Sequence, residues 1–460
     1  MRSVPDDGGA YGGSRPISEL EPSPFAFDGR GEEYAPVETL AEPAPQETRI
    51  QEAIADEAEW MADLLSRLVR ADTTLGNEEA GQQVMEAALR EIGLDPVDVW
   101  MDAEALHAHP LASPFDWDVA GKRNIVTTWG PGQGAGGRSL ILNGHIDVVS
   151  PAPLAQWGDR SPFSGDREDG WIHGRGAADM KCGLAAILGA VKALRGLGLT
   201  PKAPVHIQSV VEEECTGNGT LQTLLAGFTA DGAVVAEPFG AAITTAQVGV
   251  LWFKVRIEGV PGHAAEGSFT VNAIERSLHV IAALRELEAE LNASPPHPFD
   301  LFGHPINLNV GAISGGDWAS TVPGECTTEY RIAMYPGMSL PDLRARIEAV
   351  VAAATTDMEG AAQVLYGGFA CEGYDIADDA PLVRTLAEAF MRQGGTPPPL
   401  VATTGTSDAG VLGRMGVPAV CFGPYAEEAH GIGERVYLPS VVQTAQVLGL
   451  FIREWCGLSE

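Results

Sequence analysis

Apolar residues recur along this chain with two spacings, one typical of helices and one of strands. From about residue 47, the segment IQEAIADEAEWMADLLSRLVRA repeats apolar residues three and four positions apart, which predicts a helix. A second helix is predicted over about 78–92. Helical segments from Gly183 and after Gly219 then alternate with the strand-like runs RNIVTTW, SLILNG, APVHIQSVV and GAVVAE. This alternation predicts an α/β domain whose sheet is largely parallel or mixed.

The pattern changes near residue 246. QVGVLWFKVRIEG, INLNVGAISGG and CTTEYRIAMYP predict strands, and TVNAIERSLHVIAALRELEAEL and LPDLRARIEAVVAAA predict helices. With a last strand that ends near 366, this order predicts a ferredoxin-like α+β unit. The α/β pattern then resumes with PLVRTLAEAFMRQ, PAVCFGP and SVVQTAQVLGLFIREW. We therefore predict that a smaller domain, 246–366, is inserted into a larger domain formed by 47–245 and 367–460.

The ends of the chain and its apolar stretches give no sign of a membrane protein. Residues 1–46 are rich in Pro, Gly, Glu and Asp and poor in aliphatic residues, so we expect a disordered or loosely held acidic extension. The first thirty residues contain no apolar core of a secretory signal. The stretch CGLAAILGAVKALRGLGL contains Lys192 and Arg195, which favours a buried amphipathic helix over a membrane span.

Composition and charge narrow the class of protein. Apolar residues make up 45% of the chain, which predicts a soluble globular protein. A formal net charge of −33 disfavours nucleic acid and anionic membranes as partners. The six cysteines lie far apart without a CxxC pair, which is typical of a reduced protein rather than a disulfide scaffold. We therefore expect a cytoplasmic location.

Common short motifs are weak or missing. GQGAGG at 132–137 matches GxGxxG, but the next predicted element is the strand SLILNG and not a helix, so a hairpin turn is the better interpretation. The chain has no P-loop, no HExxH and no GxSxG. HAHP at 107–110 could bind a metal, although such a pair in a polar loop is usually only part of the loop.

Acidic and imidazole side chains gather where predicted strands of the larger domain end. LILNGHIDVVS, for example, changes from an apolar run to polar residues. The clusters are GHIDVV (His145, Asp147), GRGAADMK (Asp179), VVEEECTGNG (Glu212, Glu213, Glu214), VVAEPFG (Glu237) and EEAHGIG (His430). Taken singly, each has a plain explanation, such as a helix cap for Asp179. Together they supply the imidazole and carboxylate ligands that zinc or a similar divalent metal prefers.

These motifs, with GVPGHAA, occur in an order that resembles the M20 family of metallohydrolases from about residue 50 to the C-terminus. The family includes acetylornithine deacetylase, succinyl-diaminopimelate desuccinylase and glutamate carboxypeptidases. The resemblance implies a zinc-peptidase-like α/β catalytic domain with an inserted ferredoxin-like dimerisation (lid) domain, and hence a homodimer. It also implies two divalent metal ions, most simply Zn²⁺, with Co²⁺ or Mn²⁺ as alternatives.

The resemblance assigns the ligands motif by motif. Asp179 is implied to bridge two ions, with His145 and Glu237 completing one site and Glu214 and His430 the other. Three carboxylates and a bridging hydroxide would balance the charge of two divalent ions.

Two further acids receive supporting roles by the same resemblance. Asp147 is implied to hydrogen-bond the imidazole of His145 and fix its orientation. Glu213 is implied to be the general base that moves a proton from the attacking water to the leaving nitrogen. The register among Glu212, Glu213 and Glu214 stays open, because neighbouring side chains serve different tasks only if the segment bends.

Residues outside the metal centre are assigned to the substrate. His263 in GVPGHAAEG is implied to reach across a dimer interface to the substrate carbonyl, although a histidine at a strand-to-helix turn is the alternative. Arg331 matches the arginine that binds a substrate carboxylate, or else it pairs with an acid on its strand. Gly405 and Thr406 in GTSDAG match a substrate-side loop.

Two positions depart from the family pattern. Cys182 follows DMK where glycine is common, and Ser320 and Thr321 precede VPG where many members have asparagine. The second departure leaves substrate contacts from that loop in doubt.

The sequence therefore predicts a di-zinc amidohydrolase that cleaves the amide of an N-acyl amino acid or a related small carboxylate. A di- or carboxypeptidase that uses the same metals is the alternative enzyme, with a dipeptide-like substrate. A catalytically silent metal-binding relative is the third possibility.

Overall fold

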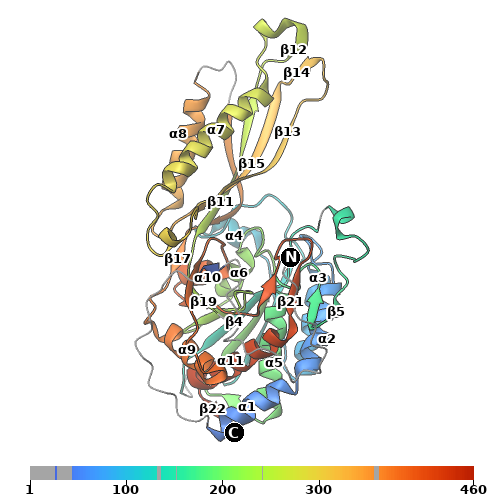
Figure 1. The fold of residues 1–460 in the computed structure, drawn as a ribbon, viewed down its shortest axis with the longest axis vertical. Coiled ribbons are helices and arrows are strands. Elements are labelled where there is room, and N and C mark those ends of the chain that lie inside the picture. The colour runs from blue at the N-terminus through green and yellow to red at the C-terminus, as the bar shows by residue number, and fades with distance from the viewer. Residues whose placement is uncertain (1–25, 28–43, 132–135, 152, 241, 357–361) are drawn as a thin grey trace.

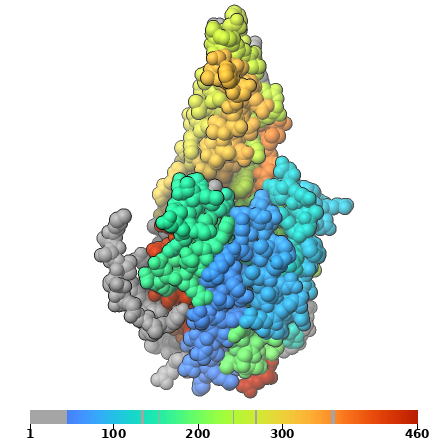
Figure 2. Space-filling model, turned by 90° about the vertical axis from the view of Figure 1, so that its right-hand side faces the viewer, coloured from blue at the N-terminus to red at the C-terminus, as the bar shows by residue number. Residues whose placement is uncertain are grey.

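The computed structural model describes residues 26–27, 44–131, 136–151, 153–240, 242–356 and 362–460. Most of the predicted acidic extension therefore lies outside the described residues. Within it, strand β1 (Ala26–Phe27) pairs with β18 (Leu400–Thr403). Figure 1 shows a broad lower body with a narrow upper unit, and Figure 2 shows the same taper from the side.

The lower body is built around one large mixed sheet. Its main path runs β1-β18-β10-β19-β9-β4-β8-β3-β2, and β17 also pairs with β10. The central strands β8, β4, β9 and β19 are parallel, whereas β2, β3 and β10 join antiparallel to their inner neighbours. The remaining strands are β2 (Val97–Trp100), β3 (Arg123–Trp129), β4 (Leu140–His145), β8 (Val205–Val210), β9 (Ala233–Val235), β10 (Ile243–Gln247), β17 (Tyr374–Asp375) and β19 (Ala419–Cys421). The predicted mixed α/β fold is therefore confirmed.

Helices cover this sheet. In Figure 1, α6 and α10 are drawn above β4, and α5 and α11 below it. The helices of the body are α1 (Pro45–Ala55), α2 (Ala58–Arg70), α3 (Glu79–Glu91), α4 (Ala103–Ala108), α5 (Lys181–Gly196), α6 (Asn218–Leu225), α9 (Pro381–Gly394), α10 (Asp408–Arg414) and α11 (Leu438–Cys456). None of the helices in the described part of the chain combines the length and apolar character needed to cross a membrane.

Two sequence predictions need correction here. The single helix predicted from residue 47 is two helices, α1 and α2, which separate at a turn at Asp56 and Glu57 and both pack on α5 and α11. The hairpin predicted at 132–137 is also wrong, because β8 lies between β3 and β4 in the sheet. Residues 132–135 themselves lie outside the described residues.

Helix α5 is the central element of the core. All of its residues from Lys181 to Val191 are buried, and so is every residue of β4. A Cβ on Gly189 would lie 2.2 Å from Met61 Sδ of α2, so a larger residue here would force the Met61 side chain to move. This packing fixes the ends of β4 and α5, from which two candidate ligands project.

The upper unit has the order strand, helix, strand, strand, helix, strand. Its elements are β11 (Gly249–Glu258), α7 (Ala273–Leu291), β13 (Leu308–Gly315), β15 (Glu325–Met334), α8 (Leu340–Ala354) and β16 (Ala362–Cys371). The sheet order is β13-β15-β11-β16 with every pairing antiparallel, which is the ferredoxin-like topology predicted. It has its own apolar core, in which Phe253 stacks on Tyr330.

Strand β16 continues through position 366 to Cys371, so the predicted boundary falls inside a strand. Small elements complete the described part of the chain: β5 (Asp166–Glu168), β6 (Trp171–His173), β7 (Thr200–Pro201), β12 (Gly262–His263), β14 (Thr321–Val322), β20 (Ala426–Glu427), β21 (Arg435–Tyr437), β22 (Leu458–Ser459) and the short 3-10 helices Leu154–Trp157, Ala264–Phe269 and Phe299–Leu301.

Candidate metal centre

Three of the five predicted ligands lie at the ends of parallel strands of the large sheet, and the other two lie in loops. His145 ends β4, Glu214 lies in the turn after β8, and Glu237 follows β9. Asp179 precedes α5, and His430 lies between β20 and β21. The carboxyl ends of neighbouring parallel strands meet at one edge of a sheet, where α/β proteins place their ligand sites.

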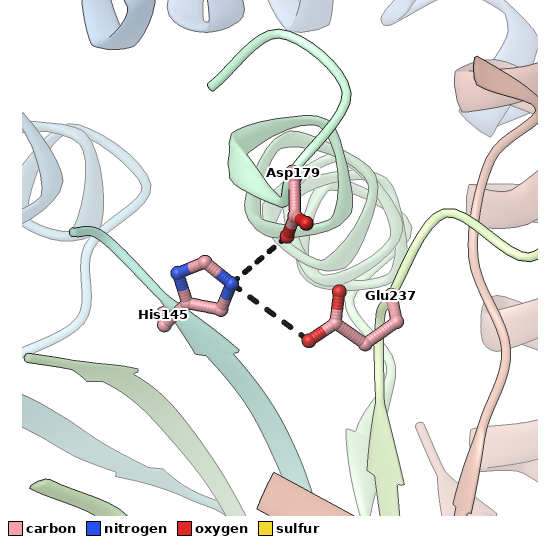
Figure 3. Close-up of side chains that lie close together, drawn as sticks. All are labelled: His145, Asp179 and Glu237. Carbon is pink, nitrogen blue, oxygen red and sulfur yellow. Dashed lines mark hydrogen bonds and ion pairs between the residues drawn. The ribbon is translucent and has the colours of Figure 1, made fainter. Parts of the chain in front are cut away.

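One group of ligand atoms surrounds His145. Its Nε2 lies 3.1 Å from Asp179 Oδ1 and 3.7 Å from Glu237 Oε1, and Figure 3 shows the two carboxylates facing the same nitrogen. The His145 Nδ1 lies 2.9 Å from the carbonyl oxygen of Asp147. A carbonyl only accepts, so Nδ1 carries the hydrogen and Nε2 is left free to bind a metal.

A second group surrounds His430. Its Nε2 lies 3.1 Å from Glu214 Oε2 and 3.3 Å from Asp179 Oδ2. Asp179 therefore presents one oxygen to each group. The structure brings all five predicted ligands together, in the predicted pairs and with the predicted shared residue.

The electrostatics of the cluster fit a cation. Burial and neighbouring carboxylates raise the pKa of Glu237 well above its usual range. Burial also opposes ionisation of Asp179, but hydrogen bonds from His145 and His430 outweigh it and lower the pKa of Asp179. The charge of Glu214 raises the pKa of His430 to about 11. Protons on the two imidazoles thus offset the negative charge of the clustered carboxylates, which divalent metal ions would offset in their place. The imidazole and carboxylate donors suit zinc.

Glu213 belongs to neither ligand group. Its Oε2 lies 3.8 Å from His145 Nε2, and its buried Oε1 has no hydrogen-bond partner among the described residues. Burial raises the pKa of Glu213 well above its usual range, opposed by His145 and reinforced by the charges of Glu237 and Asp408. A buried carboxyl beside the ligands with a free oxygen is suited to proton transfer.

Asp147 has a different partner from the one predicted. Its carboxylate accepts hydrogen bonds from the backbone N–H groups of Glu213 at 3.2 Å and Glu214 at 3.0 Å. The contact with the imidazole of His145 is made instead by the Asp147 backbone carbonyl, while the nearest carboxylate oxygen is 3.7 Å away. The reason is geometric, because the turn that carries the two glutamates presents its N–H groups to this carboxylate. Asp147 thus connects both ligand groups.

The three consecutive glutamates point to different partners. Glu212 is buried, and its Oε1 accepts hydrogen bonds from Lys122 Nζ at 2.8 Å and Trp117 Nε1 at 2.8 Å. Its backbone φ is +63°, which bends the chain so that Glu213 and Glu214 face the histidines. The bend that the sequence required is therefore present, and Glu212 is outside both ligand groups.

The helix after this turn begins earlier than predicted. Helix α6 starts at Asn218, and Gly217 at φ +71° is its N-cap. A Cβ on Gly219 would lie 1.9 Å from the Val211 carbonyl oxygen, so Gly219 permits close packing inside the first turn rather than opening the helix.

None of the predicted substrate residues belongs to either ligand group of the described chain. Arg331 is half-buried on β15 between Trp252 and Asn309, and burial lowers its pKa. Among the described residues the Arg331 guanidinium makes no hydrogen bond or ion pair, and the nearby strand acid Glu329 pairs with Lys254 instead, so the alternative pairing with an acid on its strand is absent there. The Gly405 N–H donates to Thr403 Oγ1 at 3.0 Å, and Thr406 Oγ1 donates to the Val248 carbonyl at 2.9 Å.

His263 is not brought to the ligand groups within one chain. It lies in β12, which Figure 1 places at the far end of the upper unit, and its side chain is exposed. Its Nδ1 accepts a hydrogen bond from the Ala265 N–H at 3.1 Å. Thr321 pairs with it across the β12–β14 ladder.

The remaining candidates lie outside both ligand groups. Cys182 is buried below Asp179, and its Sγ lies 3.0 Å from the Ala178 carbonyl. His107 stacks on Phe115, and His109 accepts a hydrogen bond from the Leu111 N–H.

Sequence reasoning missed three buried charged residues beside the centre. Arg175 and Glu434 form an ion pair next to Asp179 and His430. Asp408 accepts a hydrogen bond from Thr220 Oγ1 at 2.7 Å, and its Oδ1 has no partner among the described residues. Each lies within or next to a quoted motif, GRGAADMK, EEAHGIG or GTSDAG, which was the only signal available.

Comparisons with known proteins agree with this geometry. The family model for peptidase family M20/M25/M40 matches residues 141–454. N-formyl-4-amino-5-aminomethyl-2-methylpyrimidine deformylase of Halalkalibacterium halodurans is 31% identical over 74% of this chain and 85% of that protein. Succinyl-diaminopimelate desuccinylase of Magnetococcus marinus is 32% identical over 66% of this chain and 80% of that protein.

Solved structures share the fold. The dipeptidase Dug1p of Saccharomyces cerevisiae superimposes with a TM-score of 0.72 and 14% identity, covering 89% of this chain and 98% of that one. At this identity the likeness supports the architecture alone. The family model and the relatives carry the assignment, and on them the chain belongs to peptidase family M20/M25/M40 and is a hydrolase of amide bonds.

Proposed function

We propose that this protein is a di-metal amidohydrolase that removes the acyl group from an N-acyl amino acid or a related small carboxylate. The observation that carries the proposal is the pair of ligand groups that share Asp179. His145, Asp179 and Glu237 would hold one ion, and Asp179, Glu214 and His430 the other. Zn²⁺ is the first choice because imidazole and carboxylate are its ligands, and Co²⁺ or Mn²⁺ would suit the same donors.

When bound, two such ions polarise the amide carbonyl and make water easier to deprotonate. Glu213 takes the proton of the attacking water as the water oxygen bonds to the carbonyl carbon. It then delivers that proton to the nitrogen as the C–N bond breaks, which gives a carboxylic acid and a free amine. The buried position of Glu213 and its raised pKa support both transfers, because a carboxylate with a raised pKa accepts a proton more readily than an exposed glutamate does.

The substrate would be held by its carboxylate. Arg331 supports this proposal, because a half-buried guanidinium that has no partner among the described residues is suited to a bidentate anion. Gly405 and Thr406 would lie beside the substrate in the loop before α10. Deformylase and desuccinylase among the relatives favour a deacylase, whereas the match to a peptidase family keeps peptide hydrolysis as the second candidate.

We also propose that 246–366 is an inserted dimerisation domain and that 47–245 with 367–460 is the catalytic domain. Large apolar side chains exposed on the upper unit support this, including Phe269 at 84%, Trp318 at 72% and Ile313 at 53%. In a homodimer, His263 of one copy would donate to the substrate carbonyl in the other. A cytoplasmic location remains part of this proposal.

The first experiment measures bound metal and hydrolysis together on the purified protein. The substrates are N-formyl, N-acetyl and N-succinyl amino acids and dipeptides. We expect about two zinc equivalents and release of amine that stops with a chelator. Two bound ions without turnover on any substrate would favour the silent relative, and preference for dipeptides would favour the peptidase.

A further inference from the structure

A buried ion pair lies behind the ligand groups and has no part in the proposed chemistry. Arg175 Nη1 contacts Glu434 Oε2, and the two side chains are 2% and 0% exposed. Burying two charges costs solvation free energy that apolar side chains of similar size would not lose. A contribution to the stability of the fold therefore does not explain why this ion pair is buried. The other contacts of the two residues indicate their role.

Glu434 holds the segment that ends in the shared ligand. Its Oε1 accepts hydrogen bonds from the backbone N–H groups of Gly176 at 2.8 Å, Ala178 at 3.0 Å and Asp179 at 3.2 Å. The Glu434 carbonyl also accepts from the Gly174 N–H at 3.0 Å. One carboxylate thereby fixes the backbone of the loop before α5.

Arg175 reaches the other loop. Its Nη2 donates to the His430 carbonyl at 3.0 Å while Nη1 remains on Glu434. His430 has a backbone φ of +63° and a side chain that is 50% exposed, and its imidazole contacts only Glu214 and Asp179 among the described side chains, both candidate ligands themselves. The backbone contact with Arg175 therefore restrains the His430 loop from outside the two ligand groups.

We infer that Arg175 and Glu434 are positioning residues that join the Asp179 and His430 loops and set the affinity of the second metal ion. The inference rests on the proposed two-metal function. The first ion depends on this pair less, since His145 ends a buried strand and its ring is fixed by the Asp147 carbonyl. Loss of the Arg175 contact should therefore act on one ion selectively.

Arg175→Lys is the sharpest test. A single ammonium keeps the charge opposite Glu434, but it lacks the planar fork that reaches two acceptors. We expect zinc titration of the metal-free protein to show second-ion binding weakened by about 10- to 100-fold, with the first ion changed far less. Excess zinc should restore kcat, because it refills a weakened second site. A general folding defect would not be corrected in this way.

Arg435→Lys is the matched control. Arg435 follows Glu434, yet its guanidinium pairs with Glu427 at 2.7 Å and stacks over Trp171, away from both ligand groups. We expect its zinc titration to match that of the unmodified protein. Equal second-ion affinity in Arg175→Lys and the unmodified protein would overturn the inference.

A double variant guards against misfolding. Arg175→Met with Glu434→Gln removes both charges and keeps an amide oxygen for the three N–H groups. It should fold and lose the second ion selectively, and equal weakening of both ions would refute a selective role. If neither variant folds, the pair serves the fold and the inference is wrong. Failure of the unmodified protein to bind two ions would instead count against the proposed function.

Discussion

The two ligand groups share Asp179 but differ in how the chain holds them. His145 is fully buried at the end of a central strand, and Glu237 follows the next strand in the sheet. His430 is half-exposed in a loop with left-handed backbone, and Glu214 lies in a turn. The first group is placed by the sheet itself, whereas the second is placed by side chains that hold loops.

This difference determines how many additional contacts each group of ligands needs to hold its position. A ligand on a packed strand is fixed by the hydrophobic core, so few additional contacts are needed. A ligand in a loop requires hydrogen bonds of its own, which here come from Asp147 and from the Arg175–Glu434 pair. We therefore expect the first group to bind its ion more tightly than the second.

The largest effect should follow from removing the shared residue. Asp179→Ala takes one oxygen from each group, so the difference between them should disappear, with both ions and detectable hydrolysis lost. Metal analysis and amine release measure this directly. Asp159→Ala changes an exposed aspartate and should leave both properties intact. Retention of one tightly bound ion in Asp179→Ala would show that the residue is not shared.

The next effect concerns the acid that belongs to neither group. Glu213→Gln keeps the shape of the side chain but cannot take a proton, so kcat should fall by about 10²- to 10⁴-fold. Both ions should stay bound, because Glu213 is absent from both sets of ligand atoms. Loss of an ion together with kcat would make Glu213 a ligand and alter the comparison.

The smallest effect is a pH dependence of stability in the metal-free protein. Burial raises the pKa of Asp408 to about 6 and of Glu434 to about 7. Between about pH 4 and 7 the folded state therefore binds more protons than the unfolded chain. The free energy of unfolding should fall as pH rises through this window, by up to about 3 kcal/mol from Asp408.

Chemical denaturation at several pH values, with a chelator present, measures this slope. Asp408→Asn should make it shallower, and added zinc should oppose it because bound metal favours deprotonated ligands. If the metal-free protein became more stable from pH 4 to 7, burial would not raise the pKa of Asp408 and Glu434 in this way.

The sequence predicted the first group more securely than the second. Apolar runs that end in GHIDVV and VVAEPFG place His145 and Glu237 at strand ends, because strand and ligand follow each other directly. Among Glu212, Glu213 and Glu214 no periodicity could set the register. The deciding partner of Glu212 is Lys122, which is 90 positions away in the chain.

The upper unit could also be predicted from local sequence patterns, whereas contacts between residues far apart in the chain could not. Its helices and strands follow from local apolar spacing, and the ferredoxin-like order follows from their sequence. The Arg175–Glu434 pair spans 259 positions, and no local pattern contains such a contact. Asp147 was assigned to the correct neighbourhood but to the wrong hydrogen-bond donors, since the turn geometry is a property of the folded chain.

The separation of Glu214 and His430 by 216 positions also sets an order of events during synthesis. A ribosome delivers the strands around His145, Asp179 and Glu237 first, then the whole upper unit, and only afterwards the loop with His430. Helix α5, which follows Asp179, packs on the C-terminal helix α11, and β9, which precedes Glu237, pairs with β19. We therefore expect both groups of candidate ligands, and with them hydrolysis, to be complete only when the last segments of the chain have been made.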